Sequence, residues 1–495
     1  MLTQEKFHQT SVLPLLRDAR LFREQAYIAG KWCSASNGRV LPVTNPADQS
    51  YIGSIPDMRE NEAHQAVEAA QSAFADWKAR LPQERGAILQ RWYELMCENK
   101  EDLAILMTLE QGKPLAESRG EIDYAASFLQ WYAEETRRIN VETVTPHLPD
   151  CDMELRRQPV GVVAAVTPWN FPSAMITRKA AAAIAAGCPV VVRPASETPF
   201  SALALAELGE RAGLPAGLFS VVTGDPEAIV GEFNRNPKVR ALSFTGSTEV
   251  GRKLLAQGAA TVKRMSMELG GHAPFILFPD VPMEEAVSGA LSAKFATTGQ
   301  DCLAANRIYV HQDIYEPFLK AYGDAVAAQA VGNGLEADVD LGPLMSEKAI
   351  AKCQEHVDDA VAKGARLLTG GRVHECGELF YEPTLLADVT PEMKIYQQET
   401  FGPVAAVCPF ATEDEVVQRA NDTEYGLAAY LYTRDHARVK RVTSQLEYGM
   451  VAVNRVKMTG APIPFGGMKQ SGLGREGSRH GLEEFTEIQY VCSSH

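Results

Sequence analysis

The sequence lacks the cysteine patterns that mark disulfide frameworks and zinc sites. It has nine cysteines, an odd number, and no two of them form a Cys-x-x-Cys pair. It also has no uninterrupted apolar run of the roughly 18 residues that a membrane-spanning helix needs, and its first residues do not combine a basic start with an apolar stretch. We therefore expect reduced thiols, no metal site, no membrane contact and a cytoplasmic location.

An excess of positive charge is also absent. The formal net charge is −15 and the pI is near 5.3, which argues against nucleic acid as a partner. A small anionic substrate is still compatible with this balance, because a pocket can be locally basic. The chain of 495 residues is too long for one compact core, so we expect two or three domains. No internal repeat or low-complexity tract is evident.

The hydrophobic period changes along the chain. Residues 1–60 suggest short edge strands and turns, and residues 61–138 have helical spacing. From 159 onward, apolar runs typical of buried parallel strands alternate with helices, which is the βαβ rhythm of a doubly wound sheet. The expected strands are 160–166, 190–193, 219–223 and 240–245, and the helices are 174–186, 201–212, 226–233 and 248–257. A second α/β series is expected from about Met265 to 465.

Residues 141–158 alternate in polarity and contain Pro146 and Pro149. This pattern predicts an exposed β-arm that pairs with another subunit, or else a solvated hairpin.

The segment around Cys302 places a cysteine after a glycine turn and before the strand expected at 307–310. A thiol held this way is able to reach a cavity, but it acts as a nucleophile only as the thiolate, with a base or positive charge nearby. Taken alone, the segment favours a buried packing cysteine, because most single cysteines are inert residues of the core.

Two segments leave buried strands with polar residues. Thr167-Pro-Trp-Asn-Phe-Pro contains Asn170, an amide suited to stabilise an oxyanion or simply a turn residue. Arg193 and Ser196 follow the next strand, where a cation is placed to meet a phosphate or ribose hydroxyls, or only solvent. Ligands of open α/β sheets bind at such strand ends.

Four further segments carry potential chemistry. Phe244-Thr-Gly-Ser-Thr-Glu-Val-Gly begins a helix and suits an anion, although it is neither GxGxxG nor a Walker motif. Glu268 lies in an apolar run before paired glycines, where burial would raise its pKa and suit it to act as a base. A carboxylate at a strand end near a glycine turn is more often structural. Glu399 and Phe401 precede another apolar strand, and a glycine-rich loop spans 464–476.

In their order and spacing, these segments resemble the aldehyde dehydrogenase superfamily over nearly the whole chain. The stretches Ser471-Gly-Leu-Gly-Arg-Glu-Gly-Ser and Pro199-Phe-Ser-Ala-Leu-Ala-Leu-Ala-Glu-Leu are most similar to the succinate-semialdehyde dehydrogenase branch. The resemblance implies an α/β fold with two doubly wound domains, one cofactor-binding and one catalytic, plus a small β oligomerisation arm. It implies a dinucleotide-binding domain at 1–140 and 159–264, a catalytic domain at 265–465, and an arm and closing strand at 141–158 and 466–495.

The resemblance also implies roles for the site residues. Cys302 is the expected nucleophile, Asn170 the oxyanion donor, and Glu268 the base that activates water to release the acid. The expected cofactor positions are Thr167, Trp169, Arg193, Ser196, Gly246, Ser247, Gly251, Leu269, Glu399 and Phe401. Arg193 stands where the family usually has lysine, and Ser196 where many NAD-specific members have glutamate. We therefore expect NAD or NADP, with dual use before strict NADP use.

The substrate pocket departs from the branch pattern. Arg178 matches an arginine that binds the substrate carboxylate, and Thr459 replaces a serine of the branch. A second arginine of the branch falls on Ala296 and is missing, so Arg455 or Lys457 is a candidate replacement. The second cysteine of the branch's redox pair falls on Ala304, so that disulfide is not expected.

These features predict oxidation of an aldehyde with a remote anionic group, similar to succinate semialdehyde. A longer dicarboxylic semialdehyde or a sulfonated aldehyde is the alternative. A CoA-acylating enzyme is disfavoured by Glu268, and a non-catalytic protein by the joint presence of Cys302, Glu268 and Asn170. The expected assembly is a homodimer or homotetramer.

Overall fold

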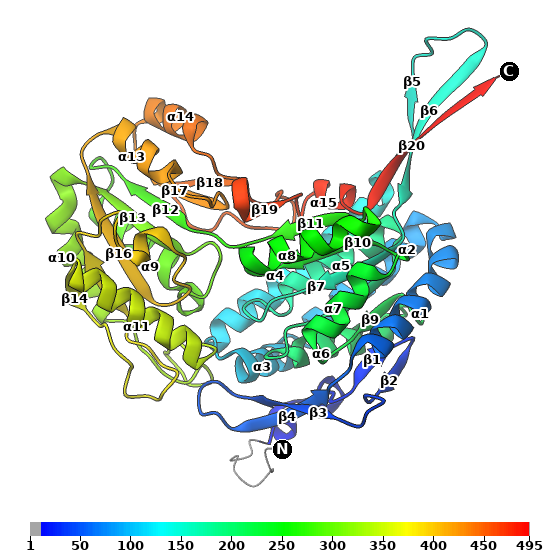
Figure 1. The fold of residues 1–495 in the computed structure, drawn as a ribbon, viewed down its shortest axis with the longest axis horizontal. Coiled ribbons are helices and arrows are strands. Elements are labelled where there is room, and N and C mark those ends of the chain that lie inside the picture. The colour runs from blue at the N-terminus through cyan, green and yellow to red at the C-terminus, as the bar shows by residue number, and fades with distance from the viewer. Residues whose placement is uncertain (1–10, 495) are drawn as a thin grey trace.

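A computed structural model describes residues 11–494. Two α/β units lie side by side, and a β-arm projects from one of them (Figure 1). The first unit contains an eight-stranded sheet of order β19-β11-β10-β7-β8-β9-β1-β2. The bounds are β1 Ala26–Ile28, β2 Lys31–Cys33, β7 Val162–Val166, β8 Val190–Arg193, β9 Phe219–Val221, β10 Val239–Thr245, β11 Arg264–Glu268 and β19 Gly472–Leu473.

The strands from β11 to β9 are parallel, and β19 and β1 pair antiparallel with the strands next to them. Helices cover both faces of this sheet, because alternate residues of each strand point to opposite sides. On one face, Val163 and Ala165 join a core with α2 (Pro82–Glu98), α3 (Lys100–Gln111), α4 (Leu115–Glu135), α5 (Ala174–Ala186) and α6 (Pro199–Arg211). On the other, Val162 and Ala164 join α1 (Glu60–Ala79), α7 (Pro226–Arg235) and α8 (Thr248–Gly258). The unit is therefore doubly wound, as predicted.

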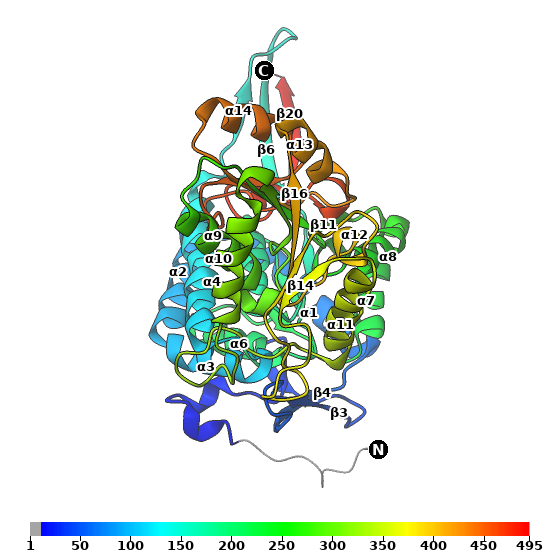
Figure 2. The same cartoon turned by 90° about the vertical axis from the view of Figure 1, so that its left-hand side faces the viewer.

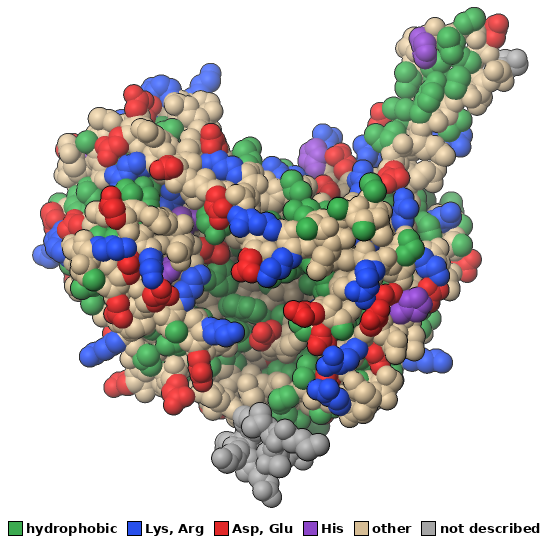
Figure 3. All heavy atoms as spheres, viewed as in Figure 1, with side chains coloured by type: hydrophobic (Ala, Val, Ile, Leu, Met, Phe, Trp, Pro, Cys, Tyr) green, Lys and Arg blue, Asp and Glu red, His purple; other side chains and the backbone are tan. Residues whose placement is uncertain are grey.

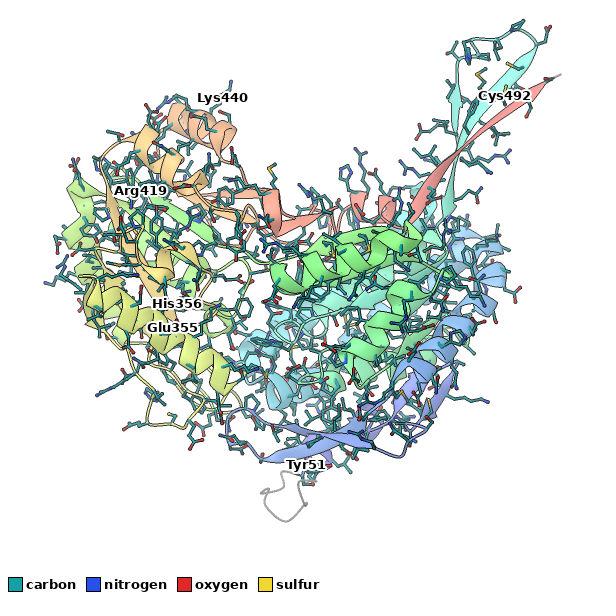
Figure 4. The ribbon with its side chains drawn as sticks, in the orientation of Figure 1. Tyr51, Glu355, His356, Arg419, Lys440 and Cys492 are labelled. Carbon is teal, nitrogen blue, oxygen red and sulfur yellow. The ribbon has the colours of Figure 1, made fainter. Side chains whose placement is uncertain are left out.

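The second unit contains a seven-stranded sheet of order β14-β15-β16-β13-β12-β17-β18. Its strands are β12 Ala273–Leu277, β13 Ala305–His311, β14 Arg366–Thr369, β15 Thr384–Ala387, β16 Val404–Phe410, β17 Ala428–Tyr432 and β18 Met450–Val453. Phe275 packs with α9 (Met283–Phe295) and α10 (Tyr315–Ala327). Ile276 packs on the opposite face with α11 (Glu347–Ala362), α12 (Lys394–Gln397), α13 (Glu413–Asn421) and α14 (His436–Gln445). Glu355 and His356 mark α11 in Figure 4.

The arm is a three-stranded antiparallel sheet of order β20-β6-β5. Its strands are β5 Glu142–Val144, β6 Cys151–Pro159 and β20 Thr486–Ser494, and the last two pair from Thr486 opposite Pro159 to Ser494 opposite Cys151. The arm projects away from both units in Figure 1, and its tip rises above the rest of the molecule in the perpendicular view of Figure 2. A separate hairpin, β3 (Val40–Thr44) with β4 (Tyr51–Pro56), lies near the described N-terminal end, and a short helix, α15 (His480–Glu483), precedes β20.

Two expectations from the sequence need correction. The second α/β series begins at β12 rather than near Met265, because β11 pairs in parallel with β10 in the first sheet. The segment 466–495 also contributes more than an arm strand, since β19 pairs with β11 at the edge of the first sheet. The precise domain boundaries stay a prediction.

The strand order of the first sheet indicates where a ligand would bind. The chain runs from β7 through β8 to β9 on one side, and then returns to add β10 on the other side of β7. Such a reversal leaves a crevice beyond the carboxyl ends of the two strands that flank it. The segments that start at Thr167 and Gly246 follow those two strands.

Within residues 11–494, no helix is long and apolar enough to cross a membrane.

Candidate active site

Cys302 lies on a tight turn between α9 and the amino end of β13. The turn contains three consecutive residues with left-handed backbone, Thr297, Thr298 and Gly299, with φ of 51°, 57° and 71°. Such conformations are costly for threonine and are typical of functional sites. The Thr297 amide donates to both oxygens of Glu117, at 3.0 and 3.1 Å. A Cβ on Gly299 would lie 2.3 Å from the Gly402 carbonyl oxygen, so this contact requires glycine.

A cavity of about 1090 Å³ opens beside this turn. The surface of the molecule is hollowed between the two α/β units (Figure 3). Of the predicted site residues, those that line the cavity are Trp169, Asn170, Arg178, Gly246, Ser247, Leu269, Cys302, Glu399, Phe401 and Thr459. Thr167, Arg193, Ser196, Gly251, Glu268 and Arg455 are not part of its wall. The sequence motifs from both units therefore converge on one space.

The Cys302 thiol is electrostatically disfavoured as a thiolate in the ligand-free protein. Burial raises its pKa well above the ordinary value, and the nearby carboxylates of Asp301 and Glu399 raise it further, while Arg178 opposes them. The strand end at Gly271 approaches the same turn so closely that a Cβ there would lie 2.0 Å from the Cys302 carbonyl oxygen. The nucleophile is thus held in place but rests as a neutral thiol, and it needs a base during the reaction.

Asn170 is held beside the cysteine turn. Its side-chain amide donates to the Gln300 carbonyl at 3.0 Å, which ties the first unit to the second. The backbone carbonyl of Asn170 accepts a hydrogen bond from Lys113 Nζ at 2.7 Å. Lys113 also forms a buried ion pair with Glu121 at 2.7 Å. An amide nitrogen carries two donors, so one N–H of Asn170 remains for a ligand in the cavity.

Glu268 ends strand β11 as a buried carboxyl group whose two oxygens have no hydrogen-bond partner. Burial raises its pKa well above the ordinary value, and the negative charge of Glu476 adds to the effect. The next two residues, Leu269 and Gly270, line the cavity. An unpaired buried carboxyl of raised pKa is typical of a catalytic acid or base.

A buried ionic cluster behind Glu268 was not identified from the sequence. Arg178 Nε donates to Glu476 at 2.5 Å, and Lys179 Nζ bonds the same carboxylate and Thr245 Oγ1. Burial alone would raise the pKa of Glu476, but Lys179 and Arg178 outweigh it and hold that pKa below the usual range. Glu476 lies in the glycine-rich loop. Arg178 and Lys179 are far from it in the sequence, so only the folded structure shows that they contact it.

Arg178 also faces the cavity. Its guanidinium lies 3.9 Å from the centre of the Phe465 ring, and its Nη1 is 3.5 Å from the Tyr124 hydroxyl. At the same side of the cavity, Thr459 and Lys457 are lining residues. The candidate Arg455 is exposed and absent from the wall, so the structure does not bring it to the substrate side. Lys457, the alternative, occupies that place.

The predicted cofactor residues form two groups. Near the cysteine, the Trp169 and Phe401 rings meet edge to face, with centroids 5.6 Å apart. Glu399 accepts a hydrogen bond from the Gly271 amide at 3.0 Å, and burial raises the pKa of Glu399 to about 7. Ser247 is the N-cap of α8, where free amide groups favour an anion.

The second group lies at the carboxyl ends of β7 and β8. Arg193 Nη2 donates to Ser196 Oγ at 2.8 Å and to the Gly224 carbonyl at 3.2 Å. Arg193 Nε and Thr167 Oγ1 are buried without a partner. Unpartnered donors at the carboxyl ends of parallel strands, next to the switch point between β7 and β10, fit the ribose or phosphate of a dinucleotide. At the start of α8, a Cβ on Gly251 would lie 2.4 Å from Leu269, so Gly251 permits close packing of the helix.

Within the part of the chain that the structure describes, no group of three or more His, Cys, Asp and Glu side chains could hold a metal ion. All nine cysteines are free thiols, including the exposed Cys492 on the arm (Figure 4).

Comparison with known proteins gives matches over nearly the whole chain. The model of the aldehyde dehydrogenase family matches residues 32–491. Glutarate-semialdehyde dehydrogenase of Pseudomonas aeruginosa is 54% identical over 477 residues, which cover 96% of this chain and 99% of the relative. Succinate-semialdehyde dehydrogenase (NADP(+)) GabD of Escherichia coli is 53% identical over 477 residues, with the same coverage. The crystal structure of succinate-semialdehyde dehydrogenase from Burkholderia pseudomallei superposes with a TM-score of 0.96 at 51% identity, covering 97% of this chain and 100% of that one.

Proposed function

The chain belongs to the aldehyde dehydrogenase family, and on this premise we propose that it oxidises an aldehyde with a remote anionic group to the carboxylic acid. It is an oxidoreductase that acts on aldehydes with a nicotinamide cofactor. One observation carries the proposal: the nucleophilic Cys302 and the buried cation Arg178 line the same cavity. A thiol suits attack on an aldehyde carbon, and a cation inside an otherwise acidic protein suits an anionic substrate.

In the proposed first half-reaction, Cys302 loses its proton to water in the cavity, and the resulting thiolate adds to the aldehyde carbon and forms a thiohemiacetal. The free N–H of the Asn170 side chain and the Cys302 backbone N–H stabilise the developing oxyanion. When bound, the nicotinamide cofactor would supply the hydride acceptor that converts the thiohemiacetal on Cys302 into a thioester. Trp169, Phe401 and Glu399 line the cavity and would hold the nicotinamide half.

In the second half-reaction, Glu268 removes a proton from water, which attacks the thioester carbonyl. The acid leaves and Cys302 returns as a thiol. Burial raises the pKa of Glu268, which makes its carboxylate a stronger base than that of an exposed glutamate. Because this carboxyl is placed to activate water, we expect hydrolysis of the thioester rather than transfer of the acyl group to CoA. The product assay separates the two outcomes: free acid supports the proposal, whereas acyl-CoA would replace it.

We propose that both NAD and NADP serve as cofactor. Ser196 is small and neutral, and its hydroxyl accepts a hydrogen bond from Arg193, so the ribose side offers a cation and no carboxylate at position 196. A cation favours a 2′-phosphate, and the serine leaves room for a 2′-hydroxyl. The relative GabD carries NADP(+) in its name, which supports the NADP half of the proposal.

For the substrate, we propose a semialdehyde whose far anion is bound by Arg178, Thr459 and Lys457, with Lys457 rather than Arg455 as the second cation. The relatives named for glutarate and succinate semialdehyde support this class without selecting the chain length. A panel of aldehydes, assayed separately with NAD and NADP, tests the proposal. Anionic semialdehydes should exceed neutral aldehydes of equal length in kcat/KM by about tenfold or more, and equal values would overturn it.

A matched pair of variants locates the effect. Arg178→Ala should raise KM sharply for the anionic aldehyde and little for the neutral one. Arg455→Ala is the control, because its side chain is exposed and outside the cavity, and it should leave both KM values unchanged. Equal effects of Arg178→Ala on the two substrates would remove Arg178 from the substrate site.

We also propose that the arm forms an interface in a homodimer or homotetramer in the cytoplasm. Hydrophobic side chains gather on the arm (Figure 3), and those exposed there include Val141, Val144, Leu148, Ile488 and Tyr490. Exposed apolar residues on an edge of paired strands are typical of a subunit contact. Sedimentation of the protein with Ile488→Glu and Tyr490→Glu should give smaller species than wild type, and an unchanged mass would contradict this role.

A further inference from the structure

A side chamber adjoins the substrate end of the main cavity. It has a volume of about 170 Å³, well above the roughly 10–15 Å³ that a single water requires. The residues that line both spaces are Ala296, Asp301, Leu303, Lys457 and Thr459. The chamber is therefore an extension of the substrate space, next to the turn that carries Cys302.

The chamber exists because its walls are built from small or fixed side chains. Ala293 and Ala296, at the end of α9, present only methyl groups. On the opposite side, the Tyr430 hydroxyl donates to the Leu303 carbonyl at 3.0 Å, which fixes both residues. The space is thus preformed, as ligand pockets usually are.

The charged residues that line the chamber are Asp301 and Lys457. Among the described residues, the solvent-exposed Lys457 has no hydrogen bond or ion pair, and Asp301 has no cation within ion-pair distance. Burial raises the pKa of Asp301, and the more distant charges of Lys113 and Arg178 oppose that rise. The Asp301 carboxylate accepts hydrogen bonds only from the Leu303 amide, at 3.0 Å, and the Cys302 thiol. In contrast, Glu476 and Glu121 compensate the cavity cations Arg178 and Lys113.

From these two charges, neither of which forms an ion pair with another described residue, we propose that the chamber receives the far end of a substrate that carries both a carboxylate and an ammonium group. Such a substrate is an amino-acid semialdehyde, with its carboxylate at Lys457 and its ammonium at Asp301. The inference rests on the proposed function and narrows its substrate class. A purely anionic substrate would meet Asp301 without compensation, and like charges that face each other weaken binding.

The position of Asp301 also links this recognition to the nucleophile. After burial, the charge of Asp301 is the largest cause of the raised pKa of Cys302. An ammonium at Asp301 offsets that negative charge and favours the thiolate. A matching substrate therefore promotes formation of the nucleophile that attacks it.

The test compares 4-oxobutanoate with 2-amino-4-oxobutanoate, which differ only by the amino group. For the wild type, kcat/KM should be higher with the amino compound. Asp301→Asn should lower the ratio of the two kcat/KM values by about fivefold or more, because one charge-assisted contact is removed. A change in the reactivity of Cys302 would alter kcat/KM for both substrates equally, so it cancels in this ratio. Lys457→Met should lower kcat/KM for both acids and leave the ratio unchanged.

A third variant fills the chamber without touching a charge. Ala296→Leu should lower kcat/KM for the amino compound relative to propanal, which does not reach the chamber, and it keeps the test valid if Asp301→Asn fails to fold. If the wild type prefers 4-oxobutanoate, if Asp301→Asn leaves the ratio unchanged, or if Ala296→Leu affects all substrates equally, the inference is wrong while the proposed function stands. If neither acid is oxidised and propanal is, both are wrong.

Discussion

Replacing Glu476 by glutamine removes the anion from the buried cluster behind the active site. The side chains of Arg178, Lys179 and Glu476 are 1%, 0% and 4% exposed, so solvent does not screen the two cations that remain. Removal of one partner from a buried ion pair costs about 3–5 kcal/mol. Because one carboxylate serves both cations here, we expect Glu476→Gln to destabilise the protein by at least about 3 kcal/mol.

The melting temperature gives the first readout. An unfolding entropy of about 2.1 cal/mol/K per residue amounts to roughly 1 kcal/mol/K for the chain of 495 residues. The expected fall in Tm is therefore at least about 3 °C, measured at one protein concentration because association also stabilises. Glu249→Gln is the control: its ion pair with Lys253 lies on the surface, with side chains 76% and 65% exposed, and Tm should not change.

Activity gives the second readout. In the wild type, the charge of Glu476 adds to burial in raising the pKa of Glu268. Without that charge, Arg178 and Lys179 favour the Glu268 carboxylate, so its pKa falls and the acid limb of kcat moves to lower pH. A Tm equal to that of the wild type, or an acid limb that stays in place or moves to higher pH, would refute the reasoning.

Three further changes have defined outcomes. Ser196→Glu places a carboxylate beside Arg193 and should lower kcat/KM with NADP about tenfold while sparing NAD; an unchanged NADP-to-NAD ratio would contradict the cofactor assignment. Gly271→Ala should abolish most activity, because its Cβ would lie 2.0 Å from the Cys302 carbonyl oxygen, whereas Gly323→Ala, with its nearest neighbour at 3.6 Å, should be active; equal activity of the two would exclude this contact. Burial raises the pKa of the Cys302 thiol, so the alkylation rate with iodoacetamide should still rise above pH 9, and a plateau near neutral pH would show that this pKa is not raised.

The regular elements could be predicted because their patterns are local. The apolar run from Val162 to Val166 can only be buried on both sides, and the structure places it in the middle of the first sheet. The Ala-rich helix α5 occupies 174–186 as expected. The pairing of β19, in contrast, depends on a two-residue contact between a glycine-rich loop and β11, from segments about 200 residues apart. No local pattern predicts such a pairing.

Site residues that directly follow a strand or a recognisable turn could also be predicted from the sequence. The direction in which a side chain points from an irregular loop could not. Asn170 and Cys302 follow recognisable segments, and both line the cavity. Arg455 and Lys457 are separated by one residue in a loop without a regular period, and only the folded backbone determines that Lys457 reaches the wall. The cluster around Glu476 likewise requires long-range contacts, because its two cations lie almost 300 positions earlier in the chain.

The central claim, covalent catalysis by Cys302 with Glu268 as the base for hydrolysis, is tested most directly by trapping the thioester. Glu268→Gln is mixed with a semialdehyde and cofactor, quenched in acid, digested and analysed by mass spectrometry. Covalent catalysis predicts a burst of NAD(P)H equal to the number of active sites and an acyl adduct on the peptide that contains Cys302. Absence of the adduct together with wild-type turnover, or an unchanged rate of aldehyde-dependent NAD(P)H formation in Cys302→Ser, would contradict it.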